Sequence, residues 1–425
     1  MSTAYPDSVR FLYSLGNEYK TIKLGLDRIE RLLEALGSPH KSLRFIHVAG
    51  TNGKGSTCAF LESSLRAAGV LTGLYTSPHL VEPTERIRVA GVPVSPEEFS
   101  QAFDLVHQEA ERLIASGDLD GHPTYFETLT SMAHLIFARR GVQTVVLETG
   151  MGGRLDATNV VDPALCVITP IDIDHEKFLG STIREIASEK AGILKRGRPA
   201  AFSRQRPEAL AVLERRAIEV GAPVSHAEDW LAQDLHIDAF GSRFTAVGPG
   251  GEIPIRCPLI GQHQVDNALT AVTALSVLGI EPDAVSRGIA ATAWPGRLEC
   301  VRQQPAVFLD GAHNAAGAWA LAQYIRELHR GKRVWMVFGA MRDKDLGVIA
   351  PLLFPLASEL ILTAPDQARA FSAAEIREIT GETRARLTAS LPEALEIAAQ
   401  AHPRDVVFIT GSLYLVGEAR RALVR

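Results

Sequence analysis

The chain lacks features that would place it in a membrane or outside the cell. No uncharged apolar stretch reaches the roughly 20 residues needed to cross a bilayer. The N-terminus, MSTAYPDSVRFLYSLGNEYK, has neither the basic start nor the apolar core of a secretory signal. Cysteine is scarce, and Cys58, Cys166, Cys257 and Cys300 lie far apart, with no CxxC pair and no disulfide framework. We therefore expect a soluble, reduced protein of the cytoplasm with no membrane partner.

An excess of positive charge is also missing, since 44 Lys and Arg residues stand against 49 Asp and Glu residues, a formal net charge of −5. This balance argues against a nucleic-acid partner. What is present is an ordinary globular composition, with 46% hydrophobic and 22% charged residues, which excludes wholesale disorder. At roughly 100–200 residues per domain, the chain of 425 residues is expected to form two or three domains.

Short apolar runs typical of buried strands alternate with segments of helical spacing. The apolar runs lie at 44–49, 142–147, 165–169, 307–309, 334–338, 360–362 and 406–409. This alternation predicts an α/β protein with mostly parallel sheets that helices cover on both faces. The glycine-containing stretch 237–257 predicts a small antiparallel excursion. A Pro-Gly break at 294–297 predicts a boundary between an ATPase domain over 1–297 and a smaller, Rossmann-like α/β domain over 298–425.

A glycine-rich segment, GTNGKGST at 50–57, separates the first apolar run from a stretch of helical spacing. A phosphate-binding loop (P-loop) needs glycines whose N–H groups converge on oxygens, a helix N-terminus, a lysine and a hydroxyl. All four parts are here, although Val48 stands at the first glycine of the strict pattern and Gly55 follows Lys54. A glycine-rich surface turn is the alternative. The flanking strand and helix favour ATP binding.

Three further polar residues follow apolar runs or turns of the first domain. Glu148 ends an apolar run, where ligands bind in an open α/β sheet, and a carboxylate there can hold Mg²⁺. Ser77, in TSPH, and His175, in DIDH, are the other candidates. Taken alone, Glu148 is equally consistent with an ordinary strand-end acid, Ser77 fits a turn residue better, and an isolated loop histidine such as His175 is usually structural or solvated. The neighbouring phosphate loop favours the functional interpretation.

The later motifs are weak when each is taken alone. Asn267, in GQHQVDN, is equally consistent with a capped helix start. Arg297 lies in the segment between the domains, from which a guanidinium can reach a phosphate. Asp310 and His313, in LDGAHN, end a strand of the second domain and could bind a ribose or a small polar substrate. Lys190 has the composition of a solvated helix lysine, and an ammonium cannot bind a metal.

In their order, these motifs resemble the folylpolyglutamate synthase and dihydrofolate synthase family of the Mur ligase superfamily. The resemblance runs nearly end to end, through HVAGTNGKGST, YTSPHL, ERIRVAG, TYFETLT, ETGMGGRLDATN, ITPIDIDHEKFLG, IASEKAGI, GQHQVDNALTA, PGRLE, LDGAHN and TGSLYLVG. It implies ATP-dependent amide formation between a pteroate or folate carboxylate and L-glutamate, through an acyl phosphate, with Mg²⁺ as cofactor. Such an enzyme positions substrates and neutralises phosphate charge. It is expected to be a monomer that acts on these small molecules and ATP.

The resemblance also implies a role for each matching residue. The ATP site would comprise Gly53, Lys54, Gly55, Ser56, Asn267, Arg297 and Asp310. The Mg²⁺ ligands would be Ser77, Glu148 and His175, and Lys190 matches a family lysine that can be carbamylated. Lys54, His175 and Lys190 are accordingly the predicted catalytic residues. The pterin and its attached groups would bind Gly25, Leu26, Asp27, Thr124, Tyr125, Phe126, Glu127, Leu155, Asp156 and Ala157, with His313 as a further substrate contact.

The segments TYFE and LDAT look like those of bacterial enzymes that accept dihydropteroate. We therefore favour dihydrofolate synthase activity together with folate polyglutamylation. A folylpolyglutamate synthase without the first activity is the close alternative. A Mur-like ligase for another amino acid, and a P-loop ATPase that regulates without ligating, are weaker alternatives.

Overall fold

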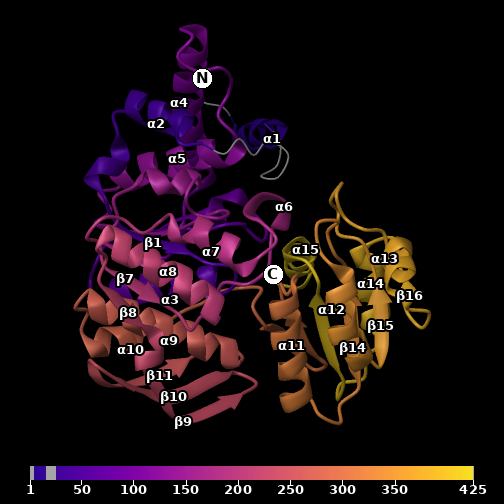
Figure 1. Ribbon diagram of the computed structural model, residues 1–425. Coiled ribbons are helices and arrows are strands. Elements are labelled where there is room, and N and C mark those ends of the chain that lie inside the picture. Colours follow the sequence, from indigo (N-terminus) through magenta and orange to yellow (C-terminus); the bar gives the residue numbers. More distant parts are fainter. Residues whose placement is uncertain (1–3, 16–24, 425) are drawn as a thin grey trace. The chain divides into compact units, whose positions relative to one another are not determined.

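The computed structural model describes residues 4–15 and 25–424, which form two compact units (Figure 1). The first unit takes in the described residues up to Gln233, together with Thr245–Ile255 and Asp266–Thr292. The second takes in Asp234–Phe244, Arg256–Val265 and the described residues from Ala293 onward. The boundary that the sequence places after residue 297 stays a prediction.

An eight-stranded, mostly parallel sheet forms the centre of the first unit, as the apolar runs predict. Its order is β4-β3-β2-β5-β1-β6-β7-β8. The strands are β1 (Arg44–Ala49), β2 (Thr72–Tyr75), β3 (Ile87–Val89), β4 (Val92–Pro93), β5 (Thr144–Glu148), β6 (Leu165–Ile168), β7 (Ala200–Phe202) and β8 (Val224–His226). Only the β2–β3 and β3–β4 pairs are antiparallel. Several strands missing from the sequence prediction, such as β7 and β8, have three residues, which is too short for a clear periodic signal.

Helices of the first unit connect these strands and cover the sheet. They are α1 (Tyr5–Ser14), α2 (Asp27–Ala35), α3 (Lys54–Ala67), α4 (Pro96–Ala115), α5 (Tyr125–Arg139), α6 (Glu176–Leu179), α7 (Ile183–Ala191), α8 (Pro207–Val220), α9 (Gln262–Val277) and α10 (Pro282–Ala290). A separate three-stranded sheet, ordered β11-β10-β9, occupies the segment where the sequence predicts a small excursion. Its strands are β9 (Leu231–Asp238), β10 (Gly241–Gly248) and β11 (Gly251–Cys257).

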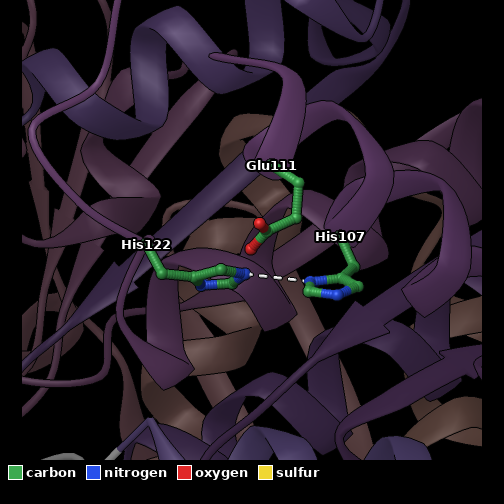
Figure 2. Close-up of side chains that lie close together, drawn as sticks. All are labelled: His107, Glu111 and His122. Atoms are coloured by element: carbon green, nitrogen blue, oxygen red, sulfur yellow. Dashed lines mark hydrogen bonds between the residues drawn. The ribbon is translucent and has the colours of Figure 1, made fainter. Parts of the chain in front are cut away.

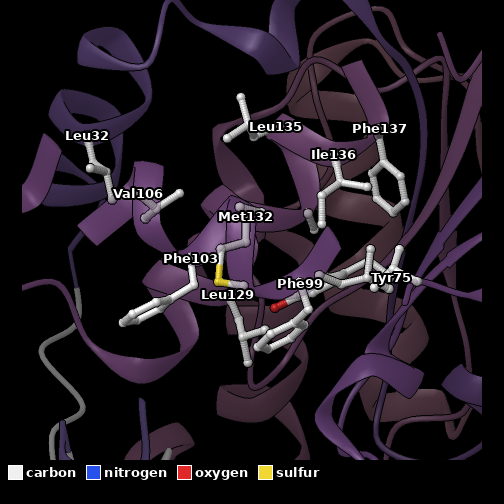
Figure 3. Packing of buried hydrophobic residues seen from close by; sticks show 14 of the residues in the cluster. Leu32, Tyr75, Phe99, Phe103, Val106, Leu129, Met132, Leu135, Ile136 and Phe137 are labelled. Carbon is white, nitrogen blue, oxygen red and sulfur yellow. The ribbon is translucent and has the colours of Figure 1, made fainter. Parts of the chain in front are cut away.

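One core of the first unit lies between α4, α5 and the sheet. Phe99 and Phe103 of α4 and Leu129 and Phe137 of α5 are buried there with Tyr75 of β2 (Figure 3). A second buried cluster joins β6 and β7 to α7 and α8. Because both cores fix the sheet, the loops at the carboxyl ends of its strands start from rigid positions.

The second unit is built on a six-stranded sheet of order β12-β13-β17-β14-β15-β16, in which only β12 is antiparallel to its neighbour. The strands are β12 (Glu299–Gln303), β13 (Ala306–Leu309), β14 (Val334–Phe338), β15 (Glu359–Leu362), β16 (Arg386–Leu387) and β17 (Val406–Thr410). The helices are α11 (Ala315–Leu328), α12 (Leu346–Leu353), α13 (Ala373–Thr380), α14 (Leu391–Ala398) and α15 (Leu413–Leu423). The predicted second α/β domain is confirmed. Across the described part of the chain, no helix combines the length and apolar character that a membrane span needs.

Candidate active site

The glycine-rich loop turns tightly between the end of β1 and the start of α3. Gly53 adopts a left-handed conformation with φ of 81°, and a Cβ atom there would lie 2.2 Å from Asn267 Oδ1. A Cβ atom at Gly50 would lie 1.9 Å from Thr169 Oγ1. Glycine is therefore required at both positions by close neighbours. The loop leads into the N-terminus of a 14-residue helix, where backbone N–H groups favour an anion.

Two lysine amines converge on one carbonyl of this loop. Lys54 Nζ donates to the carbonyl oxygens of Gly50 and Thr51, at 3.1 and 3.3 Å. Lys190 Nζ, from α7, donates to the same Gly50 oxygen at 2.8 Å. The Lys190 side chain is buried, and burial together with the charge of Lys54 lowers its pKa to about 7. Lys190 is thus a buried group of the site rather than a solvated helix lysine.

The predicted metal ligands follow the parallel strands β2, β5 and β6, whose carboxyl ends lie at the same edge of the sheet. The Ser77 backbone N–H, after β2, donates to Glu148 Oε2 at 3.2 Å, and Glu148 is only 3% exposed at the end of β5. His175 has a left-handed φ of 55° at the start of α6, and its Nε2 lies 3.9 Å from Asp174 Oδ2. A hydrogen bond of 3.0 Å from Thr51 Oγ1 to the carbonyl of Asp172 ties the His175 stretch to the phosphate loop.

Three elements that carry predicted pterin contacts, α2, α5 and the segment 155–157, meet around Phe126 and Ala157. Ala157 lies in a small buried cluster with Ile29 and Leu33 of α2, and Phe126 packs against this cluster. A Cβ atom at Gly150 would lie 2.6 Å from the Phe126 ring, so the glycine allows the ring its place. The first turn of α5, α2 and the segment 155–157 are therefore neighbours.

The other predicted pterin contacts have structural partners of their own. Glu127 forms a capping box with Thr124 at the start of α5, and Arg28 Nη1 lies 3.3 Å from Glu127 Oε2. The Tyr125 ring stacks on Tyr13 at 5.7 Å between centroids. Gly25, Leu26 and Leu155 are partly exposed, and Asp27 is exposed at the first position of α2.

A buried hydrogen-bonded chain behind Asp156 was not predicted from the sequence. Asp156 accepts the backbone N–H groups of Met151 and Thr158, at 2.8 and 3.0 Å, and its burial raises its pKa. Thr158 Oγ1 contacts both Asp156 Oδ1 and, at 2.8 Å, His47 Nε2. Burial lowers the pKa of His47 to about 3, so the imidazole is neutral. Because Thr158 donates to the carboxylate, His47 Nε2–H donates to Thr158 and orients it.

In the second unit, Arg297, Asp310 and His313 gather beside the end of β13. Asp310 is 7% exposed and accepts the backbone N–H groups of Leu298 and Ala312, at 2.9 and 3.0 Å. Burial raises the pKa of Asp310, and the nearby charge of Arg297 opposes that shift. His313 Nδ1–H donates to the Gly311 carbonyl at 2.7 Å. An acid, a guanidinium and an imidazole are thus held within a few residues of one strand end.

Comparison with known proteins covers the whole chain. The family description "Mur ligase middle domain" matches residues 48–275, and "Mur ligase, glutamate ligase domain" matches residues 296–413. The dihydrofolate synthase/folylpolyglutamate synthase of Bacillus subtilis is 38% identical over 100% of both chains. Its Escherichia coli counterpart is 35% identical over 95% of this chain and 92% of its own. The chain belongs to the dihydrofolate synthase/folylpolyglutamate synthase family.

Solved structures of this family share the fold. Mycobacterium tuberculosis folylpolyglutamate synthase complexed with ADP has a TM-score of 0.92 and 34% identity, and the match covers 100% of this chain and 99% of that one. Escherichia coli FolC in complex with DHPP and ADP has a TM-score of 0.87 and 33% identity, over 98% of this chain and 97% of that one. As a family member the chain is a ligase, and the middle-domain match contains the phosphate loop, Ser77, Glu148 and His175.

The residues absent from the sequence prediction of this ligase site are Thr169, Thr158 and His47. Thr169 follows directly after β6, so its place at a strand end was a signal that could have been used. His47 lies in the middle of an otherwise apolar strand, which marks a buried polar group in need of a partner. Its partner Thr158 is 111 residues away and could not be found without the fold.

Lys190 should give the ligase a distinct pH dependence of stability. Its pKa of about 7 in the folded state lies below the ordinary 10.5, so between these pH values the unfolded chain binds more protons. The penalty of burying the amine is then full below about pH 7 and shrinks as pH rises, by up to about 1.4 kcal/mol per pH unit. We expect wild type to gain stability relative to Lys190→Met between about pH 7 and about pH 9. Urea unfolding in buffers purged of carbon dioxide measures the difference.

The matched control is Lys41→Met, because Lys41 is an exposed lysine of the same unit. It should follow the wild-type pH dependence. A Lys190→Met protein whose stability tracks wild type at every pH would show that Lys190 does not titrate in this range.

Proposed function

We propose that this chain is an ATP-dependent ligase that joins L-glutamate to dihydropteroate and adds further glutamates to folates. The observation that carries the proposal is the phosphate loop, in which the Gly50 carbonyl accepts hydrogen bonds from Lys54 and Lys190. The chain also matches a named family member over its full length. The names of the Bacillus subtilis and Escherichia coli relatives include both activities. FolC solved with DHPP and ADP further supports a pterin and a nucleotide as ligands.

In this proposal the start of α3 binds the ATP phosphates. The backbone N–H groups of Gly53, Gly55 and Ser56 lie at the helix N-terminus, where the helix dipole favours negative charge. The Lys54 ammonium, which donates to the loop carbonyls, would donate to the terminal phosphates instead. Asn267 lies against Gly53 and would contact the nucleotide beside the loop. For Arg297 and Asp310 in the second unit, a role in ATP binding is what the family resemblance implies.

Ser77, Glu148 and His175 are the proposed ligands of Mg²⁺. A hydroxyl and a buried carboxylate are hard oxygen donors of the kind that Mg²⁺ prefers, and the ion commonly keeps waters and phosphate oxygens as its other ligands. When bound, Mg²⁺ neutralises phosphate charge. The Ser77 backbone N–H holds Glu148 in place, so the carboxylate is oriented before the ion arrives.

The reaction needs activation of a substrate carboxylate, which is a poor electrophile. Transfer of the γ-phosphoryl group gives an acyl phosphate, the amine of L-glutamate attacks its carbonyl carbon, and phosphate leaves. Lys54 and the helix N-terminus would stabilise the charge on the transferred group. Phe126 and Ala157 would hold the pterin ring, so that its distant carboxylate lies at the phosphate.

We also propose that Lys190 is carbamylated, as the family resemblance implies. With a pKa of about 7, much of the amine is neutral near neutral pH and can attack carbon dioxide. An N–C bond forms, one C=O electron pair moves to oxygen, and the amine releases a proton to solvent. With carbon-13 bicarbonate, wild type and Lys41→Met should give a carbamate NMR signal that Lys190→Met lacks. The same signal in all three proteins would assign it to another amine.

A folylpolyglutamate synthase without dihydrofolate synthase activity is the second candidate. It is favoured by the relative from Lacticaseibacillus casei, which is named folylpolyglutamate synthase alone and is 34% identical over 99% of both chains. The two candidates differ only in whether dihydropteroate is accepted as a substrate.

Mass spectrometry of the products decides between them. With ATP, Mg²⁺ and L-glutamate, wild type should add glutamate to dihydropteroate and to tetrahydrofolate, with phosphate release that requires both organic substrates. Lys54→Ala should lose turnover by orders of magnitude, since the cation for the terminal phosphates is gone, while exposed Lys41→Ala should not. If dihydropteroate gives no product, the chain is a folylpolyglutamate synthase without dihydrofolate synthase activity. Phosphate release without glutamate would point to an ATPase regulator.

Phe126 should separate the two reactions. A substrate that already carries glutamate must place its ring differently from dihydropteroate if both present a carboxylate at the same phosphate. Loss of an aromatic contact costs roughly 0.5–1.5 kcal/mol, so we expect Phe126→Ala to lower kcat/KM for dihydropteroate about two- to tenfold more than for tetrahydrofolate. Ala157→Leu should act likewise by filling space. Exposed Phe240→Ala is the control, and equal losses on both substrates would show a shared ring position.

A further inference from the structure

The end of α4 and the loop after it bring together three side chains that can bind a metal, directly before the segment 124–127 that is proposed to contact the pterin. His107 and Glu111 lie four residues apart on α4 and therefore share one face of the helix. His122 comes from the loop that leads to α5. One ligand atom from each of the three residues lies within 4.8 Å of the other two (Figure 2). None of these residues belongs to the resemblance or to the predicted site.

The two histidines direct nitrogens at each other. His107 Nδ1 and His122 Nε2 are 3.1 Å apart. His122 Nδ1 lies 2.9 Å from the Pro123 carbonyl oxygen, which can only accept, so Nδ1 carries the proton. His122 Nε2 is then the nitrogen with the lone pair, and it points toward His107 and Glu111 (Figure 2). A ring N–H bonded to a backbone carbonyl is also the usual support of a metal-binding histidine.

Aromatic rings fix the histidine pair before any ion binds. The Phe11 ring lies 4.4 Å from His107 and 5.3 Å from His122, measured between centroids. Phe103 stacks on His107 at 5.4 Å with an interplanar angle of 9°. Glu111, by contrast, is exposed, so an ion from solvent can reach the cluster from its side. Two oriented imidazoles and a mobile carboxylate form a pre-organised ligand set.

The spacing and chemistry of this set suit a transition metal. Two imidazole nitrogens bound to Zn²⁺ at 2.0–2.1 Å in tetrahedral geometry are about 3.3 Å apart, close to the observed separation. Imidazole favours Zn²⁺ and its neighbours over Mg²⁺, which prefers oxygen ligands. We propose that His107, Glu111 and His122 bind a divalent transition-metal ion of the Zn²⁺ class, with solvent as the remaining ligand. To bind the ion, His107 takes the tautomer with its proton on Nε2, exchanged through solvent, which frees Nδ1 as a ligand.

Such an ion would fasten the loop before α5 to α4. Two ligands belong to the last turns of α4, and the third precedes Pro123 and Thr124, the N-cap of α5. The site is structural and does not depend on the proposed ligase function. It stabilises the folded chain because the unfolded chain does not hold the three ligands together.

Zinc titration of the full-length, metal-stripped chain tests the site. Calorimetry in excess Mg²⁺ should show one Zn²⁺ bound per chain, and Glu111→Gln should weaken that binding roughly tenfold or more. Glu109→Gln is the matched control. It removes the same charge two residues away from Glu111, and Glu109 pairs with Arg112 rather than facing the histidines. His122→Gln should abolish the site. Co²⁺ bound in place of Zn²⁺ should give visible absorption bands that Glu111→Gln changes and Glu109→Gln does not.

Two results would overturn the proposal. The first is equal Zn²⁺ affinity in wild type, Glu111→Gln and Glu109→Gln. It would show that Glu111 is not a ligand and that the two histidines only form a hydrogen bond and ring contacts. The second is full binding in a folded His122→Gln protein, which would place the ion elsewhere. If His122→Gln fails to fold, the Zn²⁺ affinity of Glu111→Gln still tests the proposal. Glu111 is exposed, so this variant without metal should unfold at the same temperature as wild type.

Discussion

The loop between β1 and α3 lies so close to Thr169 and Asn267 that neither Gly50 nor Gly53 has space for a Cβ atom. This close approach determines the direction of the Gly50 carbonyl, and that carbonyl in turn receives the amines of Lys54 and Lys190. A displaced loop would separate the two lysines as well as move the helix N-terminus. The placement of the charged groups in the site therefore depends on glycine at positions 50 and 53.

The strand order explains why residues far apart in sequence share this site. β2, β5, β1 and β6 are consecutive parallel neighbours, so their carboxyl ends lie at one edge. Parallel neighbours need long crossover connections, which puts Ser77 and Glu148 71 residues apart although they are hydrogen-bonded. The same connections contain α4 and α5, whose packing on Tyr75 holds the Phe126 region at the side of the sheet.

The parts of the site that could be predicted from the sequence are those whose signal is local. The phosphate loop and Glu148 follow directly after short apolar runs, and the confirmed parallel α/β architecture follows from the same runs. The link from His47 to Asp156 passes through Thr158 and depends on tertiary contacts across 111 residues. The pair of His107 and His122 could not be predicted for the same reason. The spacing of His107 and Glu111 on one helix is visible in the sequence, but the approach of His122 depends on the path of the loop between α4 and α5.

Two amines that donate to one carbonyl bring two basic groups close together. Asp174 and Asp156 raise the pKa of Lys190, yet burial and the charge of Lys54 outweigh them, and its pKa is lowered. An anion changes this balance, since a phosphate near the loop stabilises both ammonium groups, while a carbamate on Lys190 supplies a negative charge beside Lys54. Both outcomes replace repulsion between the lysines by attraction. Burial is the largest cause of the lowered pKa, so a negative charge beside the two amines would raise the pKa of Lys190 and keep more of it protonated.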